Sequence, residues 1–260
     1  MVLLSFLVVT GCSRRDILDD YPVSGVEVRL DWSGVTEKLP EGVRIIFYPK
    51  DEKGRKIDTY LSVTGGEVKV PSGHYAVVIY NYDTETVLIR GEESYETIQA
   101  YTNFCKLGIA GTEKMVWGPD PLYVVNIDDL DIQNSEETLI LKLKPKLVIR
   151  TYSFSIKVQG LSNVSNVIGS IGGMADHYFL GKAYAMCDDY PINIDLNVKA
   201  GKIEGVFTTF GLPEAIITRL EIKLPVMMNL MIIKVDNSVQ EVKINITEAV
   251  QEPTGGGEGG

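Results

Sequence analysis

Carboxylates gather at three places in the sequence and could by type perform acid–base or metal chemistry. They are the trio Asp128, Asp129 and Asp131, the pair Glu136 and Glu137, and the pair Asp188 and Asp189. A glycosidase needs two carboxylates about 5–10 Å apart on one sugar site, whereas adjacent residues of a strand point to opposite faces. We therefore interpret all three groups as solvated loop carboxylates. Weak calcium binding by the trio is the alternative, although its spacing does not match an EF-hand loop.

The histidines and glycines give no catalytic pattern. The only histidines are His74 and His177, and the spacing of the three cysteines matches no zinc motif, so no metal site is predicted. Neither histidine has a serine or cysteine at a spacing that suggests nucleophilic catalysis, and we expect both at the surface or at a sheet edge. The stretch "GSIGGM" (169–174) is followed by no expected helix, so it is not a nucleotide loop. The sequence predicts a non-enzymatic protein with no cofactor.

Cys12 is the residue whose local sequence indicates a chemical modification. An apolar run at 2–9, too short to span a bilayer, leads into Val9-Thr10-Gly11-Cys12, which resembles the bacterial lipobox. In that motif the cysteine receives diacylglycerol, the chain is cut before it, and the new amino terminus is acylated, giving a stable membrane anchor. Residues 1–11 are therefore predicted to be a lipoprotein signal peptide, although Met1–Leu4 lack its usual basic residues. The alternative is a buried strand at 2–9 followed by an ordinary thiol.

The remaining cysteines, Cys105 and Cys187, leave two alternatives open. They form a disulfide if the compartment is oxidising and their Cα atoms lie within about 7 Å. Otherwise they are two separate, partly buried thiols.

Composition limits the partners. The net charge of −10 and the isoelectric point near 4.8 argue against nucleic acid, because phosphate binding needs clustered Lys and Arg. No stretch of eighteen apolar residues is present, so no helix is expected to span a bilayer.

From Gly25 onward, apolar residues recur with a period of two, which is typical of β-strands. In "VEVRLDW" (26–32), Val26, Val28, Leu30 and Trp32 fall on one face, and Tyr75 is expected in a core with Val77 and Ile79. Turn residues separate short segments of this kind, the pattern of a β-sandwich. The expected strands are 26–32, 43–49, 56–63, 67–71, 74–81, 86–90, 95–102, 122–127, 138–145, 146–160, 167–175, 177–186, 193–201, 202–211, 215–224, 230–235 and 239–247.

Pro145 interrupts a continuous apolar alternation and indicates passage between two sheet systems. The predicted fold is all-β, with two tandem β-sandwich domains at 25–144 and 145–250. A linker at 12–24 precedes them, and a flexible Gly-rich tail at 251–260 follows them.

Several phrases resemble the fimbrillin-type lipoproteins of Bacteroidetes, specifically minor or anchor-like fimbrial subunits. They are "VRLDWSG" (28–34), "LPEGVRIIFYPKD" (39–51), "PSGHYAVVIYNYDTETVLIRG" (71–91), "VWGPDPLYV" (116–124) and "GSIGGMADHYFLG" (169–181). The resemblance implies transthyretin-like sandwiches, lipidation at Cys12, a surface-exposed place on the outer membrane, and fimbrial subunits as partners. It also implies assembly by β-strand complementation.

Two functions follow as expectations. The first is an outer-membrane lipoprotein that acts as a structural or adhesive subunit of fimbriae. It would serve as an anchor or accessory subunit, and a host molecule or a glycan is a possible ligand. No convincing Arg-based cleavage site is present, because Arg14 and Arg15 lie close to the lipid and Arg90 ends an expected strand. The alternative is a surface glycan-binding lipoprotein of a nutrient uptake system, which requires exposed aromatic rings lining a groove.

Overall fold

The computed structural model describes residues 23–51, 54–105, 114–199, 201–214 and 225–251. Most of these residues form strands. The helices among them are one 3₁₀ turn, Leu161–Asn163, and the short helix α1, Thr247–Gln251. No helix in these ranges is long and apolar enough to cross a membrane. The signal peptide 1–11, most of the linker 12–24, the expected strand 215–224 and most of the tail 251–260 lie outside the described residues.

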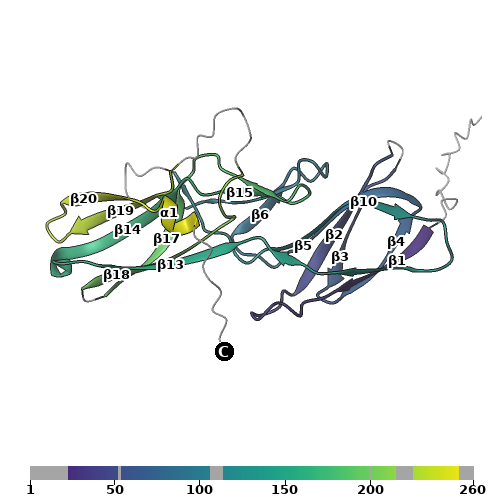
Figure 1. Ribbon diagram of the computed structural model, residues 1–260, viewed down its shortest axis with the longest axis horizontal. Coiled ribbons are helices and arrows are strands. Elements are labelled where there is room, and N and C mark those ends of the chain that lie inside the picture. Colours follow the sequence, from purple (N-terminus) through teal and green to yellow (C-terminus); the bar gives the residue numbers. More distant parts are fainter. Residues whose placement is uncertain (1–22, 52–53, 106–113, 200, 215–224, 252–260) are drawn as a thin grey trace, which may run out of the picture.

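The molecule is elongated, with sheets at its two ends and a smaller sheet between them (Figure 1). The first sheet has eight strands in the order β11-β1-β4-β3-β2-β5-β10-β12. Neighbours are antiparallel except β1 and β11, which are parallel. The bounds are β1 Val23–Leu30, β2 Gly42–Pro49, β3 Ile57–Ser62, β4 Gly65–Pro71, β5 Gly73–Asn81, β10 Tyr123–Ile132, β11 Leu139–Leu143 and β12 Lys146–Leu147.

The turn between β3 and β4 depends on Gly65. Its φ is +105°, a backbone conformation that residues with a Cβ rarely adopt. A Cβ at this position would also lie 2.0 Å from the carbonyl oxygen of Val28 in β1. Glycine therefore allows this turn to pack against the neighbouring strand.

Strands β2 and β5 are buried on both faces, as their nearly continuous apolar sequences require. One face of the sheet carries the first core, which includes Val26, Ile45 and Ile79. The other face carries a second core, which includes Ile46 and Val78. The alternation expected over 26–32 is confirmed, since Val26, Val28, Leu30 and Trp32 are at most 9% exposed.

The second core is closed by a four-stranded sheet in the order β16-β15-β7-β6. Its strands are β6 Val87–Arg90, β7 Gln99–Thr102, β15 His177–Phe179 and β16 Tyr184–Met186. The central pair joins segments that are far apart in sequence, because His177 lies opposite Tyr101. We call this the middle sheet.

The third sheet has the order β13-β18-β17-β14-β19-β20, with β9 attached to β17 and β8 to β9. It encloses a third core that includes Ile171, Phe207 and Met228, and Val250 of α1 packs into this core. The bounds are β8 Phe104–Cys105, β9 Met115–Val116, β13 Arg150–Lys157, β14 Val164–Gly172, β17 Ile192–Lys199, β18 Lys202–Thr209, β19 Met227–Lys234 and β20 Val239–Asn245.

The all-β prediction is confirmed, and several strand bounds are corrected. The segment 177–186 is a hairpin of β15 and β16 rather than one strand, and the left-handed Ala183 (φ +58°) lies between them. Of 95–102, only 99–102 forms a strand. Strand pairing also crosses the domain boundary expected near residue 144. Strands β7 and β9 precede this boundary, but β7 pairs with β15 and β9 pairs with β17, both of which follow it. The division into 25–144 and 145–250 stays a prediction.

Candidate functional site

The first described strand, β1, is built into the interior of its sheet. It pairs with β4 on one side and β11 on the other, and its Val26 and Val28 are almost fully buried. Removing this strand would expose the first core, leave β11 without a described partner and leave β4 paired with β3 alone. Cys12, the predicted lipidation site, lies outside the described residues, about 11 residues before β1 begins. A fully extended segment of that length reaches at most about 40 Å.

The third sheet ends in two strands that have one partner each among the described residues. Strand β13 pairs with β18, and β20 pairs with β19. Each edge also turns partly covered apolar side chains toward the third core, namely Tyr152, Phe154 and Ile156 from β13, and Val242 and Ile244 from β20. A strand edge with unpaired backbone groups and partly covered apolar side chains can accept a strand from another chain.

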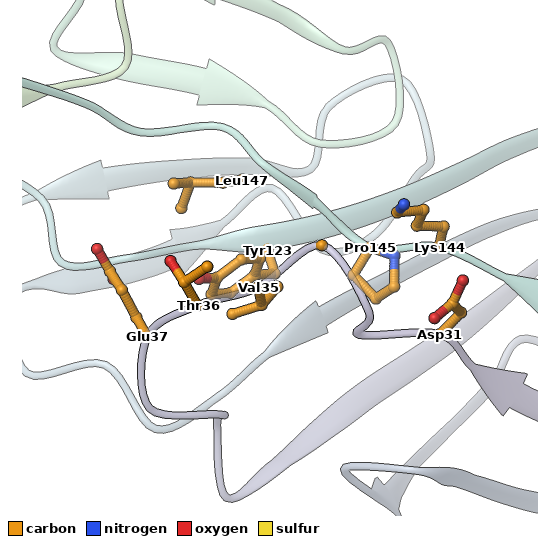
Figure 2. Close-up of a pocket in the computed structure, with 9 residues that line it drawn as sticks. Asp31, Val35, Thr36, Glu37, Tyr123, Lys144, Pro145 and Leu147 are labelled. Carbon is orange, nitrogen blue, oxygen red and sulfur yellow. The ribbon is translucent and has the colours of Figure 1, made fainter. Parts of the chain in front are cut away.

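A pocket of about 170 Å³ lies where the chain leaves the first sheet (Figure 2). The loop after β1 supplies Asp31, Val35, Thr36 and Glu37, and the passage from β11 to β12 supplies Lys144, Pro145 and Leu147. Hydrogen bonds from Ser33 hold the pKa of Asp31 below its usual value, with a smaller contribution from Lys144. The pocket is smaller than the roughly 300–1,000 Å³ of typical ligand sites. It suits a single inserted side chain rather than a substrate.

A larger cleft, about 530 Å³, lies between the first sheet and the middle sheet. It contains lysines, carboxylates and two tyrosines, but several of these groups are already paired. Tyr95 donates a hydrogen bond of 2.8 Å to Asp128, and Lys182 lies 2.8 Å from a carboxylate oxygen of Glu96. Burial is the main cause that raises the pKa of Tyr95. The tyrosine rings of this cleft, Tyr48 and Tyr95, are buried and offer no stacking surface.

The aspartate trio lies on β10, not on a loop, so that expectation was wrong. A β-bulge between Ile127 and Leu130 sets Asp128 and Asp129 opposite the single residue Ala76. Asp128 accepts from Tyr95, whereas Asp129 lies 3.2 Å from both Lys50 and His74. Lys50 and then His74 lower the pKa of Asp129 through hydrogen bonds. Asp131 in turn lies 3.7 Å from His74. Each carboxylate of the trio therefore already has a described partner, which does not favour a shared calcium ion.

The two histidines differ in environment. His74 is exposed, as expected, with 52% of its side chain accessible. His177 is only 5% exposed, so the expectation of a surface histidine was wrong. Its Nδ1 lies 2.6 Å from Asp176, and Asp188 is also close. Sequence reasoning missed this group because one extended strand at 177–186 would place Asp176 and Asp188 about 40 Å apart.

Cys105 and Cys187 are free thiols in the structure. Burial raises the pKa of Cys105, and burial with nearby carboxylates raises that of Cys187 to about 11. A thiol with a raised pKa is a poor nucleophile at neutral pH. A disulfide between the two cysteines stays a prediction, which electrophoresis with and without reductant would test.

This architecture has counterparts among known proteins. Residues 11–195 match the family described as "Domain of unknown function (DUF5119)". The chain belongs to the DUF5119 family. This DUF5119 chain is 52% identical over 273 residues to the "Putative fimbrium anchoring subunit Fim4B" of Bacteroides ovatus, covering 100% of the chain and 82% of that relative.

Two solved structures resemble the DUF5119 chain. One is the crystal structure of a "putative adhesin" from Bacteroides ovatus, with a TM-score of 0.83 and 52% identity over 94% of this chain and 89% of that one. The other is "the fimbrial anchor protein Mfa2 from Porphyromonas gingivalis", with a TM-score of 0.55 and 15% identity, covering 87% and 83%. The two Bacteroides ovatus matches, each 52% identical to this chain, confirm the predicted relation to Bacteroidetes fimbrial proteins. The likeness to Mfa2 shows that the fold is shared.

Proposed function

We propose that the chain is an anchoring or accessory subunit of a fimbria, held on the outer membrane by lipid on Cys12. The observation that carries this proposal is the identity of 52% to a fimbrium anchoring subunit along the whole chain. The position of β1 inside its sheet supports the role of an anchor rather than that of a shaft subunit. An anchor keeps its amino-terminal strand, and β1 pairs on both sides and contributes to a core.

Assembly is proposed to occur by strand addition at β20, the edge of the third sheet. This strand lies at the end of the molecule opposite β1, so a lipid near β1 and a partner at β20 would act at opposite ends (Figure 1). Val239 at the start of β20 is 59% exposed, and Val242 and Ile244 of the same strand are only partly covered. An added strand would pair with β20 and cover these side chains.

Site-specific photo-crosslinking tests the docking edge. A photoreactive residue replaces Val239 on the edge strand, and a control replaces Val206 of β18, an interior strand whose valine is 45% exposed. We expect position 239 to crosslink to the next fimbrial subunit of the same organism and position 206 not to. Equal yields at both positions, or none at position 239, would reject strand addition at this edge.

The surface features favour the fimbrial role over glycan binding. Two pairs of exposed rings in the described chain, Tyr60 with Tyr82 and Phe104 with Tyr190, stand at 88° and 81°, so neither pair forms one flat stacking platform. Neither these rings nor the exposed Trp117 line the two pockets described above. We propose no catalytic role, because the relatives named above are a fimbrium anchoring subunit and an adhesin by their descriptions.

A further inference from the structure

Asp176, His177 and Asp188 meet at one end of the middle sheet. One ligand atom from each residue lies within 4.8 Å of the others. The Nδ1 atom of His177 is 2.6 Å from Oδ1 of Asp176 and 3.9 Å from Oδ2 of Asp188. The β15–β16 hairpin produces this meeting, because Asp176 directly precedes the hairpin and Asp188 follows it closely.

The three side chains differ in exposure in a way that suits an entry path. Asp176 and His177 have only 5% and 6% of their side chains exposed, whereas Asp188 has 54% exposed. A small ion could therefore reach the two buried groups from solvent past Asp188. Water would complete its coordination on the open side.

The backbone already holds Asp176 in place. Its Oδ2 atom accepts hydrogen bonds from the backbone N–H of Asp188, at 2.8 Å, and of Tyr190, at 3.3 Å. Oδ1 is the oxygen that faces His177. Contacts of this kind fix the orientation of a metal-binding carboxylate before the ion arrives.

The charge around the cluster is not balanced by lysine or arginine. In the described part of the chain, neither residue type forms an ion pair with Asp176, Asp188 or the adjacent Asp189. His177 is the basic group within reach of Asp176 and Asp188. A bound cation would offset this local negative charge.

We propose that Asp176, His177 and Asp188 bind a divalent transition-metal ion of the Zn²⁺ class. Imidazole nitrogen with carboxylate oxygen is a ligand set that suits zinc, whereas calcium takes six to eight oxygens. On binding, the Nδ1 atom of His177 and one oxygen of each aspartate contact the ion. The ion would link the loop at 187–190, which leads into β17, to His177 of β15 in the middle sheet. This proposal does not depend on the fimbrial role.

Calorimetric titration of the full chain tests the site. The protein is purified without an affinity tag, stripped with a chelator and titrated with ZnCl₂. We expect one Zn²⁺ per chain, with affinity at least tenfold weaker in Asp188→Asn and in His177→Gln. Asp189→Asn is the matched control, because Asp189 is adjacent but outside the cluster, and its φ of +65° suits asparagine. His74→Gln is a second control for the exposed histidine.

Melting temperatures and a calcium titration complete the test. Because Asp188 is exposed, Asp188→Asn should have the same melting temperature as wild type in the absence of metal. Added Zn²⁺ should raise the melting temperature of wild type but not that of Asp188→Asn. CaCl₂ should give no stoichiometric binding. The proposal is overturned by absence of stoichiometric Zn²⁺ binding, by wild-type affinity in Asp188→Asn, or by loss of binding in His74→Gln alone. Binding of Ca²⁺ in preference to Zn²⁺ would overturn the choice of ion.

Discussion

The hydroxyl of Tyr95 donates a hydrogen bond of 2.8 Å to Asp128 and so joins the loop between β6 and β7 to the bulge in β10. Tyr95 is 6% exposed and belongs to the second core, which lies between the first sheet and the middle sheet. This bond is one of the polar links across that interface. Another is the bond from Asn126 to the carbonyl oxygen of Gly181, at 3.1 Å.

Tyr95→Phe removes the hydroxyl but keeps the ring. We expect it to lower the free energy of unfolding by about 1 kcal/mol, the usual net contribution of one such hydrogen bond. Tyr60→Phe is the matched control, because that ring is 60% exposed, and it should change stability by less than about 0.5 kcal/mol. Urea unfolding measures both variants. Equal effects would mean that the Tyr95–Asp128 bond does not stabilise the interface.

Buried tyrosines should make the free energy of unfolding fall at alkaline pH. Burial is the largest cause that raises the pKa of Tyr48, Tyr80 and Tyr95. A raised pKa in the fold means that the stabilisation is fully present below the unfolded value, about pH 10, and is lost as pH rises through the folded values. Urea unfolding at about pH 9 and about pH 11 should show the loss, with a shallower slope in Tyr95→Phe. A flat profile over that range would contradict buried, neutral rings.

Ile45 and Ile46 are adjacent on β2 and fully buried, yet they face different cores. Ile45→Ala and Ile46→Ala should each lower the free energy of unfolding by about 2–5 kcal/mol, because each leaves a cavity. Ile140→Ala, at a residue 46% exposed, should cost about 0.5 kcal/mol or less. If Ile46→Ala behaves like the control, the first sheet is not covered on both faces.

Alanine substitutions at Gly65 and Gly160 distinguish the cost of backbone strain from the cost of steric contact. Gly160 has φ +79° and open space where a Cβ would lie, whereas a Cβ on Gly65 would meet Val28. Gly160→Ala should cost about 1–2 kcal/mol from strain alone. Gly65→Ala should cost more, above about 2 kcal/mol, because the strain is joined by displacement of β1. Thermal unfolding of the two variants checks the order, and a reversed order would contradict the packing of this turn.

Part of the fold follows from local sequence, because several strands, such as β1, bury one apolar face. The alternation in 26–32 predicts β1 and its buried residues, and Asp236-Asn237-Ser238 predicts the hairpin of β19 and β20, where Asn237 has φ +64°. These features depend on near neighbours in the chain. Local propensity and a single buried face are enough to specify them.

Long-range pairing could not be predicted in the same way. Nothing local in 99–102 indicates that it pairs with 177–179, since a strand edge accepts many partners. The bulge at Asp128 and Asp129 arises from the pairing with β5 and is invisible without it. The same holds for the cluster of Asp176, His177 and Asp188, which comes together because the β15–β16 hairpin returns the chain toward its start.

Anchoring through Cys12 is tested by the distribution of fimbriae between cells and medium in a Cys12→Ser strain. We expect wild-type protein to incorporate labelled palmitate and to hold fimbriae on the cell. Cys12→Ser should lose the label, leave the membrane fraction and release fimbriae into the medium, while Cys187→Ser should behave as wild type. Membrane-bound, labelled Cys12→Ser protein with fimbriae still on the cells would contradict anchoring through Cys12.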